Sequence, residues 1–231
     1  MSVEAFLARN RAWSARMCST DAEFFRRLAR QQAPECLWIG CSDSRVAANQ
    51  ILDLAPGEVL THRNVANVVA TGDLNCLSVL QFAVDVLKVR HVMVVGHYGC
   101  GGIRAAVEGL RLGLVDGWLR HIHDVQARHR PALMALPPAE RADLLCELNV
   151  AEQFANVCRT NIVQDAWERG QTLSVHGWVY ELQDGLLREL GLSASHSDEA
   201  DDAYRKAIDG MSRSVAGTRR CHAELRCAAH A

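Results

Sequence analysis

The sequence lacks the features that would place the chain in a membrane, on a nucleic acid or outside the cell. No apolar run approaches the roughly 20 residues that a membrane-spanning helix needs. The 25 lysines and arginines do not outnumber the 27 aspartates and glutamates, whereas nucleic-acid-binding domains usually carry a basic excess. Residues 1–13 also lack the long apolar core of a signal peptide. We therefore expect a cytoplasmic protein that binds neither membranes nor nucleic acid.

The nine cysteines do not have the pattern of a secreted disulfide framework, because their number is odd and no export signal precedes them. In a reducing compartment most are expected to be small buried apolar groups, and a few to be metal ligands. Cys221, His222 and Cys227 lie close together, but their spacing and polar surroundings make a poor metal site. Five others lie in apolar or helical surroundings and are interpreted as packing residues: Cys18, Cys36, Cys76, Cys146 and Cys158.

Alternating strand and helix patterns predict one α/β domain with a mainly parallel sheet flanked by helices. Segments 35–40 and 91–97 are apolar without alternation, which is typical of strands covered on both faces. Further strands and helices are expected at 57–67 (strand), 73–89 (helix with Asp73 as N-cap), 103–145 (interrupted helices), 149–170 (one long helix) and 172–182 (strand nearer an edge). The predicted layout is a helical N-terminal arm at 1–33, the α/β domain at 34–195, and a C-terminal helix with a loose tail at 196–231.

Two motifs place sulfur and nitrogen ligands directly after predicted strands. In LWIGCSDSR, Cys41 follows the first strand. In VVGHYGCGG, His97 and Cys100 follow the third. Because the carboxyl ends of neighbouring parallel strands meet in one crevice, we expect these three side chains to converge. Two thiolates and one imidazole are a good zinc set, and three protein ligands are typical of a catalytic site with an open fourth position.

Asp43 and Arg45 follow Cys41 so closely that a role at the same metal is expected. Asp43 is the natural fourth ligand, and a carboxylate leaves zinc more readily than a thiolate does. Arg45 can then hold the released carboxylate with two parallel hydrogen bonds. We interpret the pair as a carboxylate gate and its latch.

Gly101 and Gly102 lead into the helix that follows Cys100. Their backbone N–H groups could point at an anion beside the metal. The glycines could equally serve only to make a tight turn. The sequence leaves both interpretations open.

Together these motifs resemble the β-class carbonic anhydrases, and the similarity extends over roughly residues 5–192. The shared stretches look like those of bacterial members: LWIGCSDSRV, HRNVAN, DLNCLSVLQFAVDVL, GHYGCGG, CELNVAEQ, AWERGQ and HGWVYELQDG. The resemblance implies one zinc ion per subunit on Cys41, His97 and Cys100, beside an Asp43–Arg45 dyad.

The same resemblance implies reversible hydration of CO2 to bicarbonate and a proton, by attack of a zinc-bound hydroxide on CO2. It implies a parallel sheet with an antiparallel addition. It also implies a homodimer or homotetramer with active sites at the dimer interface. Gln32 corresponds to a glutamine that the family uses near the substrate, beside the backbone of Gly101 and Gly102.

One subgroup of the family closes its zinc site with the aspartate and binds bicarbonate in a second, non-catalytic pocket. This chain resembles that subgroup at Trp38, Arg63 and Tyr180, so the resemblance implies allosteric inhibition by bicarbonate. The residue types suit an anion, because arginine offers paired donors, tyrosine a hydroxyl and tryptophan an indole N–H. Considered by residue type alone, the two aromatics fit a packed core and the arginine fits a surface ion.

Two other functions are compatible with the residues. A similar zinc fold could hydrolyse COS or CS2, and a comparison of CO2 and CS2 turnover would decide. A non-catalytic zinc or redox protein could use Cys41 and Cys100 as a thiol pair. The Asp43–Arg45 dyad argues against this second alternative, since a thiol switch needs neither residue.

Overall fold

One five-stranded sheet organises the computed structural model, which describes residues 2–30 and 32–228, with side chains described to residue 213. The strand order is β2-β1-β3-β4-β5. The first four strands run parallel, and β5 is antiparallel to β4. This arrangement confirms the predicted α/β class. The strands are β1 Cys36–Cys41, β2 Val59–Asn64, β3 His91–His97, β4 Ser174–Tyr180 and β5 Leu187–Ala194.

Burial along the strands follows their apolar patterns. β1 is buried at every residue, and β3 is buried at every residue after His91, as expected for strands covered on both faces. β4 instead alternates buried and half-buried residues. It lies next to the edge strand β5, which confirms the prediction that this strand is nearer an edge.

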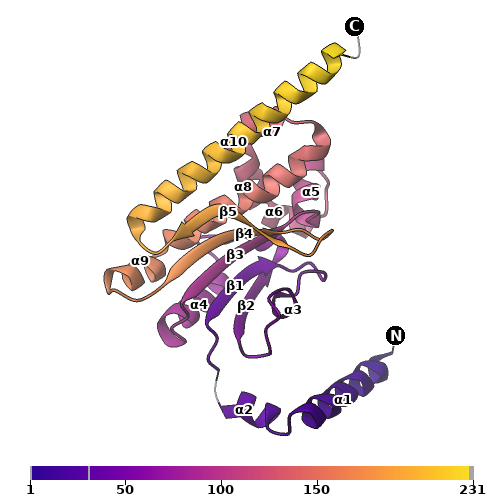
Figure 1. Cartoon of the computed structure of the whole chain (residues 1–231), viewed down its shortest axis with the longest axis vertical. Coiled ribbons are helices and arrows are strands. Elements are labelled where there is room, and N and C mark those ends of the chain that lie inside the picture. Colours follow the sequence, from indigo (N-terminus) through magenta and orange to yellow (C-terminus); the bar gives the residue numbers. More distant parts are fainter. Residues whose placement is uncertain (1, 31, 229–231) are drawn as a thin grey trace.

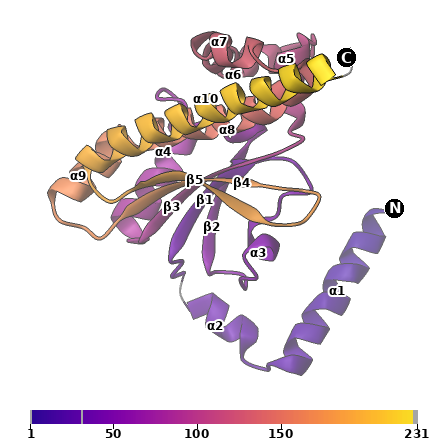
Figure 2. The ribbon, with the colours of Figure 1, turned by 45° about the horizontal axis from the view of Figure 1, so that its top comes forward.

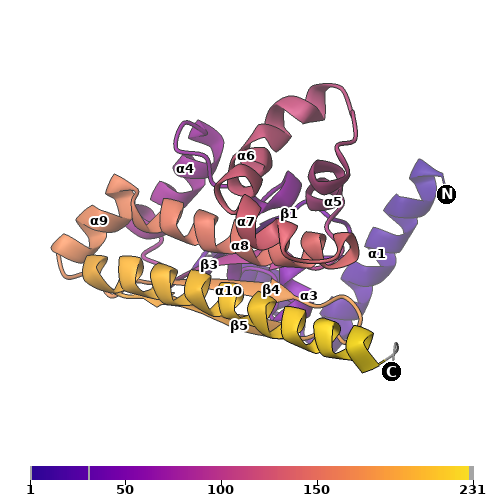
Figure 3. The same cartoon turned by 90° about the horizontal axis from the view of Figure 1, so that it is seen from above.

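Helices cover the sheet in two unequal layers. The main hydrophobic core lies on the face covered by α4, α6 and α8 (Figures 1 and 3), and α8 packs on both β3 and β4. A smaller cluster, which includes Trp38 and Met93, lies on the other face. The helices are α1 Val3–Thr20, α2 Phe24–Arg30, α3 Ala48–Ile51, α4 Leu74–Gln81 with a π-helical turn Phe82–Val86, α5 Gly101–Glu108, α6 Leu114–Arg128, α7 Arg130–Met134, α8 Pro138–Cys158, α9 Asn161–Glu168 and α10 Ser197–Ala228.

α8 approaches the end of β3 closely enough to restrict the residue before His97. A Cβ atom on Gly96 would lie 2.6 Å from Val150 Cγ2 of α8. This separation is well inside van der Waals contact, so glycine is the residue that fits there. The close packing holds the last residues of β3 against α8.

The predicted N-terminal arm is helical and projects away from the sheet (Figures 1 and 2). No residue of α1 is buried, and its large apolar side chains Phe6, Leu7 and Trp13 are exposed. Trp13 makes an edge-to-face contact with Phe25 of α2. The arm therefore packs mainly against itself within one chain.

Three details differ from the sequence predictions. The long helix expected at 149–170 is two helices, because Thr160 breaks the chain direction and caps α9 by accepting a hydrogen bond from the Val163 N–H. The helix at 73–89 does begin at Asp73, which accepts from Asn75 N–H, but it ends in a π-helical turn. α10 continues to Ala228, where a loose tail was expected. The side chains of Cys221, His222 and Cys227 lie outside the described residues.

None of the described helices has the length and apolar character required to cross a membrane. This finding concerns residues 2–30 and 32–228.

Candidate metal centre

The parallel sheet brings three candidate ligands to one point at its carboxyl edge. Cys41 is the last residue of β1, and His97 is the last residue of β3, its neighbour in the sheet. Cys100 precedes α5, after a turn in which Gly99 has a φ of +68°. The three ligand atoms lie within 4.8 Å of one another, and all three residues are buried.

The geometry of these atoms fits a tetrahedral zinc ion. Cys41 Sγ and Cys100 Sγ are 3.9 Å apart, and two sulfurs bound to one zinc at about 2.3 Å would be about 3.8 Å apart. His97 Nδ1 lies 3.0 Å from the Tyr98 carbonyl oxygen, which fixes the tautomer with the proton on Nδ1. His97 Nε2 is then a buried acceptor with no hydrogen-bond partner in the described structure. A metal ion bound between the two sulfurs would satisfy that nitrogen.

The two sulfurs also interact with each other and with the backbone. The hydrogen bond shared between them lowers the pKa of the Cys41 thiol and raises that of Cys100. The Ala66 N–H donates to Cys41 Sγ at 3.4 Å, which further favours the Cys41 thiolate. This backbone donor stabilises the Cys41 thiolate, the form that binds metal.

Asp43 faces the three ligands but is held by Arg45. Arg45 Nε donates to Asp43 Oδ1 at 2.9 Å and Arg45 Nη2 donates to Oδ2 at 2.7 Å. Arg45 Nη2 also donates to the Gly99 carbonyl oxygen at 3.3 Å. The side-chain hydrogen bonds from Arg45 hold the pKa of Asp43 well below its usual range. Asp43 Oδ2 is 3.8 Å from His97 Nε2, so the carboxylate lies beside the ligand set while it is bound to the arginine.

Gly101 and Gly102 occupy the first turn of α5 in different surroundings. A Cβ on Gly102 would lie 3.0 Å from Val65 Cγ1 and 3.4 Å from Ala66 Cβ. Packing against residues 65–66 therefore accounts for Gly102. Outside the adjoining chain, no atom lies within 4 Å of the corresponding position on Gly101, which is exposed.

Trp38 and Arg63 are brought together around Gly40, the residue before Cys41. A Cβ on Gly40 would lie 2.2 Å from Trp38 Nε1, so the indole folds over this glycine. Trp38 Nε1 is buried and has no hydrogen-bond partner in the described structure. Arg63 is opposite Gly40 in the β1–β2 register, and Tyr180 packs against the cluster that contains Trp38. Trp38 and Arg63 therefore lie beside Gly40, whereas Tyr180 is the last residue of β4, two strands away in the sheet.

Arg63 makes two hydrogen bonds that the sequence did not predict. Arg63 Nε donates to the Cys41 carbonyl oxygen at 2.9 Å, and Arg63 Nη2 donates to the Asp43 carbonyl oxygen. Arg63 therefore supports the loop that carries Asp43. Gln32 is exposed, lies between α2 and β1, and makes no hydrogen bond to the site within the described part of this chain.

Sequence reasoning missed the contribution of α8. Cys146 donates from Sγ to the His97 carbonyl oxygen at 3.2 Å, and Asn149 Nδ2 donates to the Ala66 carbonyl oxygen at 2.9 Å. Asn149, Glu152 and Gln153 are buried on this helix. The signal was present, because polar residues recur at helical spacing within a helix that is otherwise apolar on its buried side.

The fold and the buried Cys–His–Cys set define a zinc-dependent enzyme. A sequence profile of the carbonic anhydrase family matches residues 36–187. The chain belongs to the carbonic anhydrase family, whose members are zinc-dependent lyases.

Individual proteins support the same assignment. The chain is 50% identical to a carbonic anhydrase of Emericella nidulans over 184 residues, which cover 79% of this chain and 81% of that protein. It is similar to a solved β-carbonic anhydrase of Coccomyxa in complex with acetazolamide, with a TM-score of 0.81 and 40% identity over 86% of this chain and 90% of that one. A tetrameric β-carbonic anhydrase of the ascomycete Sordaria macrospora has a TM-score of 0.79 and 37% identity over 83% and 98% of the two chains.

These relatives refine the resemblance stated from the motifs. The family is confirmed, but the proteins named above are not the bacterial members that the motifs suggested. The subgroup with an aspartate-closed site and a bicarbonate pocket is therefore a matter for proposal.

Proposed function

We propose that the chain catalyses the reversible hydration of CO2 to bicarbonate and a proton at Cys41, His97 and Cys100. The observation that carries the proposal is the buried, unpartnered His97 Nε2 facing two sulfurs whose 3.9 Å separation suits one zinc ion. Carbonic anhydrase activity is also what the family and its relatives have in common. The test is a stopped-flow measurement of CO2 hydration on protein of known zinc content, with CS2 as the competing substrate. Turnover of CS2 without turnover of CO2 would refute the proposal.

When bound, zinc would lower the pKa of a water molecule towards neutrality and so supply the hydroxide that adds to CO2. Two thiolates neutralise the charge of the ion, so this pKa should lie above that of a site made of three neutral histidines. The chain contributes the remaining functions. Asp43 accepts a hydrogen bond from the nucleophile and orients it, and Gly101 leaves space beside the ligands for CO2 or bicarbonate.

Asp43 and Arg45 are proposed to act as the gate. With Asp43 held by Arg45, the fourth position beside the three ligands is free for solvent. When Asp43 is released from Arg45, its carboxylate can take the fourth position itself. The bidentate pair supports this proposal, because Arg45 holds both carboxylate oxygens and leaves Oδ2 3.8 Å from the His97 nitrogen.

Bicarbonate is proposed to act on the gate through Trp38, Arg63 and Tyr180. Among the described residues the buried indole N–H of Trp38 has no hydrogen-bond partner, so it is a donor available to an anion. Arg63 binds the carbonyl oxygens of Cys41 and Asp43. An anion that draws Arg63 away from these oxygens would loosen the loop that holds Asp43 in its latched position. Bicarbonate would thereby favour the closed site.

The assembly is proposed to be a homodimer or homotetramer with active sites at the dimer interface. Support comes from the N-terminal arm, because an 18-residue helix with no buried residue and exposed Phe6 and Trp13 needs a partner surface. Gln32 lies at the base of that arm, where it would reach the site of a partner rather than its own. The Sordaria macrospora relatives are tetrameric. We retain the cytoplasm as the proposed compartment.

A further inference from the structure

The turn after β2 has a backbone conformation that L-residues rarely adopt. It comprises Val65–Asn67, in which Ala66 has φ 64° and ψ 31°, and Asn67 has φ 46°. Asparagine tolerates this left-handed region, but alanine pays a steric penalty there. Both residues are buried. The surrounding structure must therefore hold Ala66 in place.

The same residue makes a hydrogen bond to a metal ligand. The Ala66 N–H donates to Cys41 Sγ at 3.4 Å. A donor aimed at a thiolate stabilises its charged form, which is the form that binds zinc. The N–H and the carbonyl oxygen of Ala66 flank its left-handed Cα, so a bond that anchors the carbonyl oxygen also restrains the donor.

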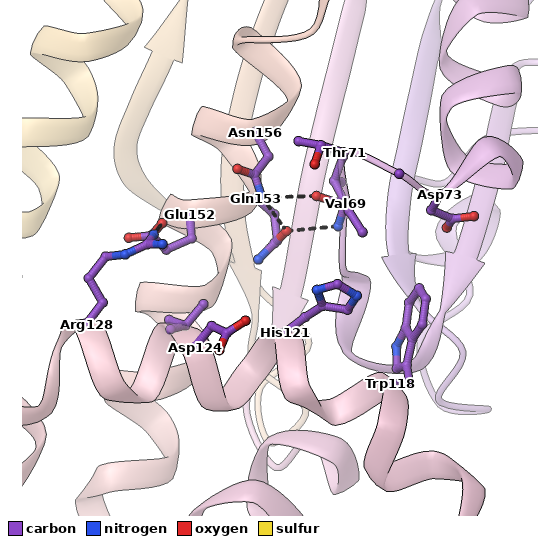
Figure 4. Close-up of a pocket in the computed structure, with 13 residues that line it drawn as sticks. Val69, Thr71, Asp73, Trp118, His121, Asp124, Arg128, Glu152, Gln153 and Asn156 are labelled. Atoms are coloured by element: carbon purple, nitrogen blue, oxygen red, sulfur yellow. Dashed lines mark hydrogen bonds and ion pairs between the residues drawn. The ribbon is translucent and has the colours of Figure 1, made fainter.

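Amide side chains of α8 make hydrogen bonds to the backbone of Ala66 and Val69, within and just after this turn. Asn149 Nδ2 donates to the Ala66 carbonyl oxygen at 2.9 Å, and Gln153 Nε2 donates to Asn149 Oδ1 at 3.0 Å. Gln153 Oε1 in turn accepts the Val69 N–H at 2.9 Å. Asn156 Nδ2 completes the ladder with a 3.0 Å bond to the Val69 carbonyl oxygen (Figure 4).

The same face of α8 also contacts the second ligand strand. Cys146 Sγ donates to the His97 carbonyl oxygen at 3.2 Å. Cys146, Asn149, Gln153 and Asn156 are spaced by three, four and three residues, which places them on one stripe of the helix. One helix face thus touches the backbone on both sides of the metal position.

We propose that Asn149 is a positioning residue for the zinc centre, acting through the Ala66 N–H on the Cys41 sulfur. The proposal rests on the zinc site of the proposed function. Asn149 is 1% exposed, and its amide is satisfied at both ends by Ala66 and Gln153. An apolar residue would fill the same space, so packing alone does not explain the amide.

The test compares zinc affinity in full-length variants by competition with a chromophoric chelator. Asn149→Ala should bind zinc up to about 10-fold more weakly than the wild type, because loss of a direct hydrogen-bonding partner of a metal ligand weakens binding 10–100-fold and Asn149 acts one residue further away. The cobalt-substituted variant should also show a shifted sulfur-to-cobalt absorption band. Gln164→Ala is the matched control, because Gln164 Nε2 makes a similar bond to the Cys158 carbonyl oxygen away from the metal. Its zinc affinity and cobalt spectrum should be unchanged.

A second substitution separates positioning from general stability. Glycine adopts a positive φ without a steric penalty, so Asn149→Ala/Ala66→Gly should regain zinc affinity relative to Asn149→Ala. A role in packing alone predicts no rescue, since Ala66→Gly removes a further buried methyl group. If Asn149→Ala does not fold, Gln153→Ala replaces it and should weaken zinc binding in the same direction.

Wild-type zinc affinity in a folded Asn149→Ala or Gln153→Ala variant would overturn the proposal, as would absence of the glycine rescue. These outcomes are distinct from failure of the proposed function. A wild-type protein that binds one zinc ion but does not hydrate CO2 would end the functional proposal, while the affinity comparison would still decide the role of Asn149.

Discussion

Substitution of Arg45 by alanine should favour the closed site, in which Asp43 takes the fourth position beside the three ligands. The wild-type guanidinium donates to both oxygens of Asp43, at 2.9 and 2.7 Å. The variant loses these two bonds and keeps only the backbone N–H bond from residue 45 to Asp43 Oδ1, at 2.9 Å. Asp43 Oδ2 is 3.8 Å from His97 Nε2, within about 0.5 Å of the separation expected for two ligands of one tetrahedral zinc. A small movement therefore suffices to close the site.

The size of the effect follows from the lost bonds. The Arg45 side chain is 56% exposed, so solvent screens the pair, and its loss should change the balance between arginine-bound and zinc-bound Asp43 by roughly threefold to tenfold. Displacement of the carboxylate from zinc by hydroxide would take up one hydroxide equivalent from solvent, so each pH unit changes this balance tenfold. Arg45→Ala should therefore move the rise of activity with pH upward by about 0.5–1 unit.

Stopped-flow CO2 hydration measured from neutral to alkaline pH at constant ionic strength tests this shift. The matched control is the double variant Asp43→Ala/Arg45→Ala. Because it lacks the carboxylate, its pH profile should not move upward relative to that of Asp43→Ala. A profile of Arg45→Ala that superimposes on the wild type would refute the gate.

Three further predictions concern the gate, the second anion pocket and stability. Asp43→Ala should retain zinc, measured by metal analysis, because three protein ligands remain, yet its hydration rate should fall strongly since the nucleophile is no longer oriented. Added bicarbonate should move the rise of the wild-type hydration rate to higher pH. Tyr180→Phe or Trp38→Phe should weaken that response without loss of zinc. If bicarbonate does not move the wild-type profile, these residues serve only in packing. Burial lowers the pKa of His176 and His129, so their contribution to stability is present above the ordinary histidine pKa of about 6.5 and is lost as the pH falls through the lower folded-state values. The melting temperature should decrease over that interval, and less so in His176→Asn; an equal decrease in both proteins would exclude His176 as a cause.

Much of the metal centre could be predicted because strand ends carry it. Cys41 and His97 each follow an apolar strand, and parallel neighbours in a sheet must bring their carboxyl ends together. The position of Cys100 then follows from its three-residue distance to His97. These ligand positions could be predicted because each depends only on residues close by in the sequence.

The remaining features depend on contacts between distant segments. The left-handed Ala66 carries no local signal, since alanine does not favour that conformation. The support from Asn149 comes from a helix 83 residues further along the chain. The break at Thr160 was also missed, because apolar spacing continues through it and only the capping hydrogen bond to Val163 marks the new helix.

The central claim is that one zinc ion on Cys41, His97 and Cys100 carries the hydration of CO2. The most direct measurement is titration of zinc into metal-free protein, with the hydration rate and bound zinc determined on the same samples. The rate should rise in proportion to bound zinc and reach its plateau at one ion per chain, whereas Cys41→Ala should bind no zinc and show no activity. A zinc-loaded wild type without activity, or a Cys41→Ala variant that keeps full zinc, would contradict the account.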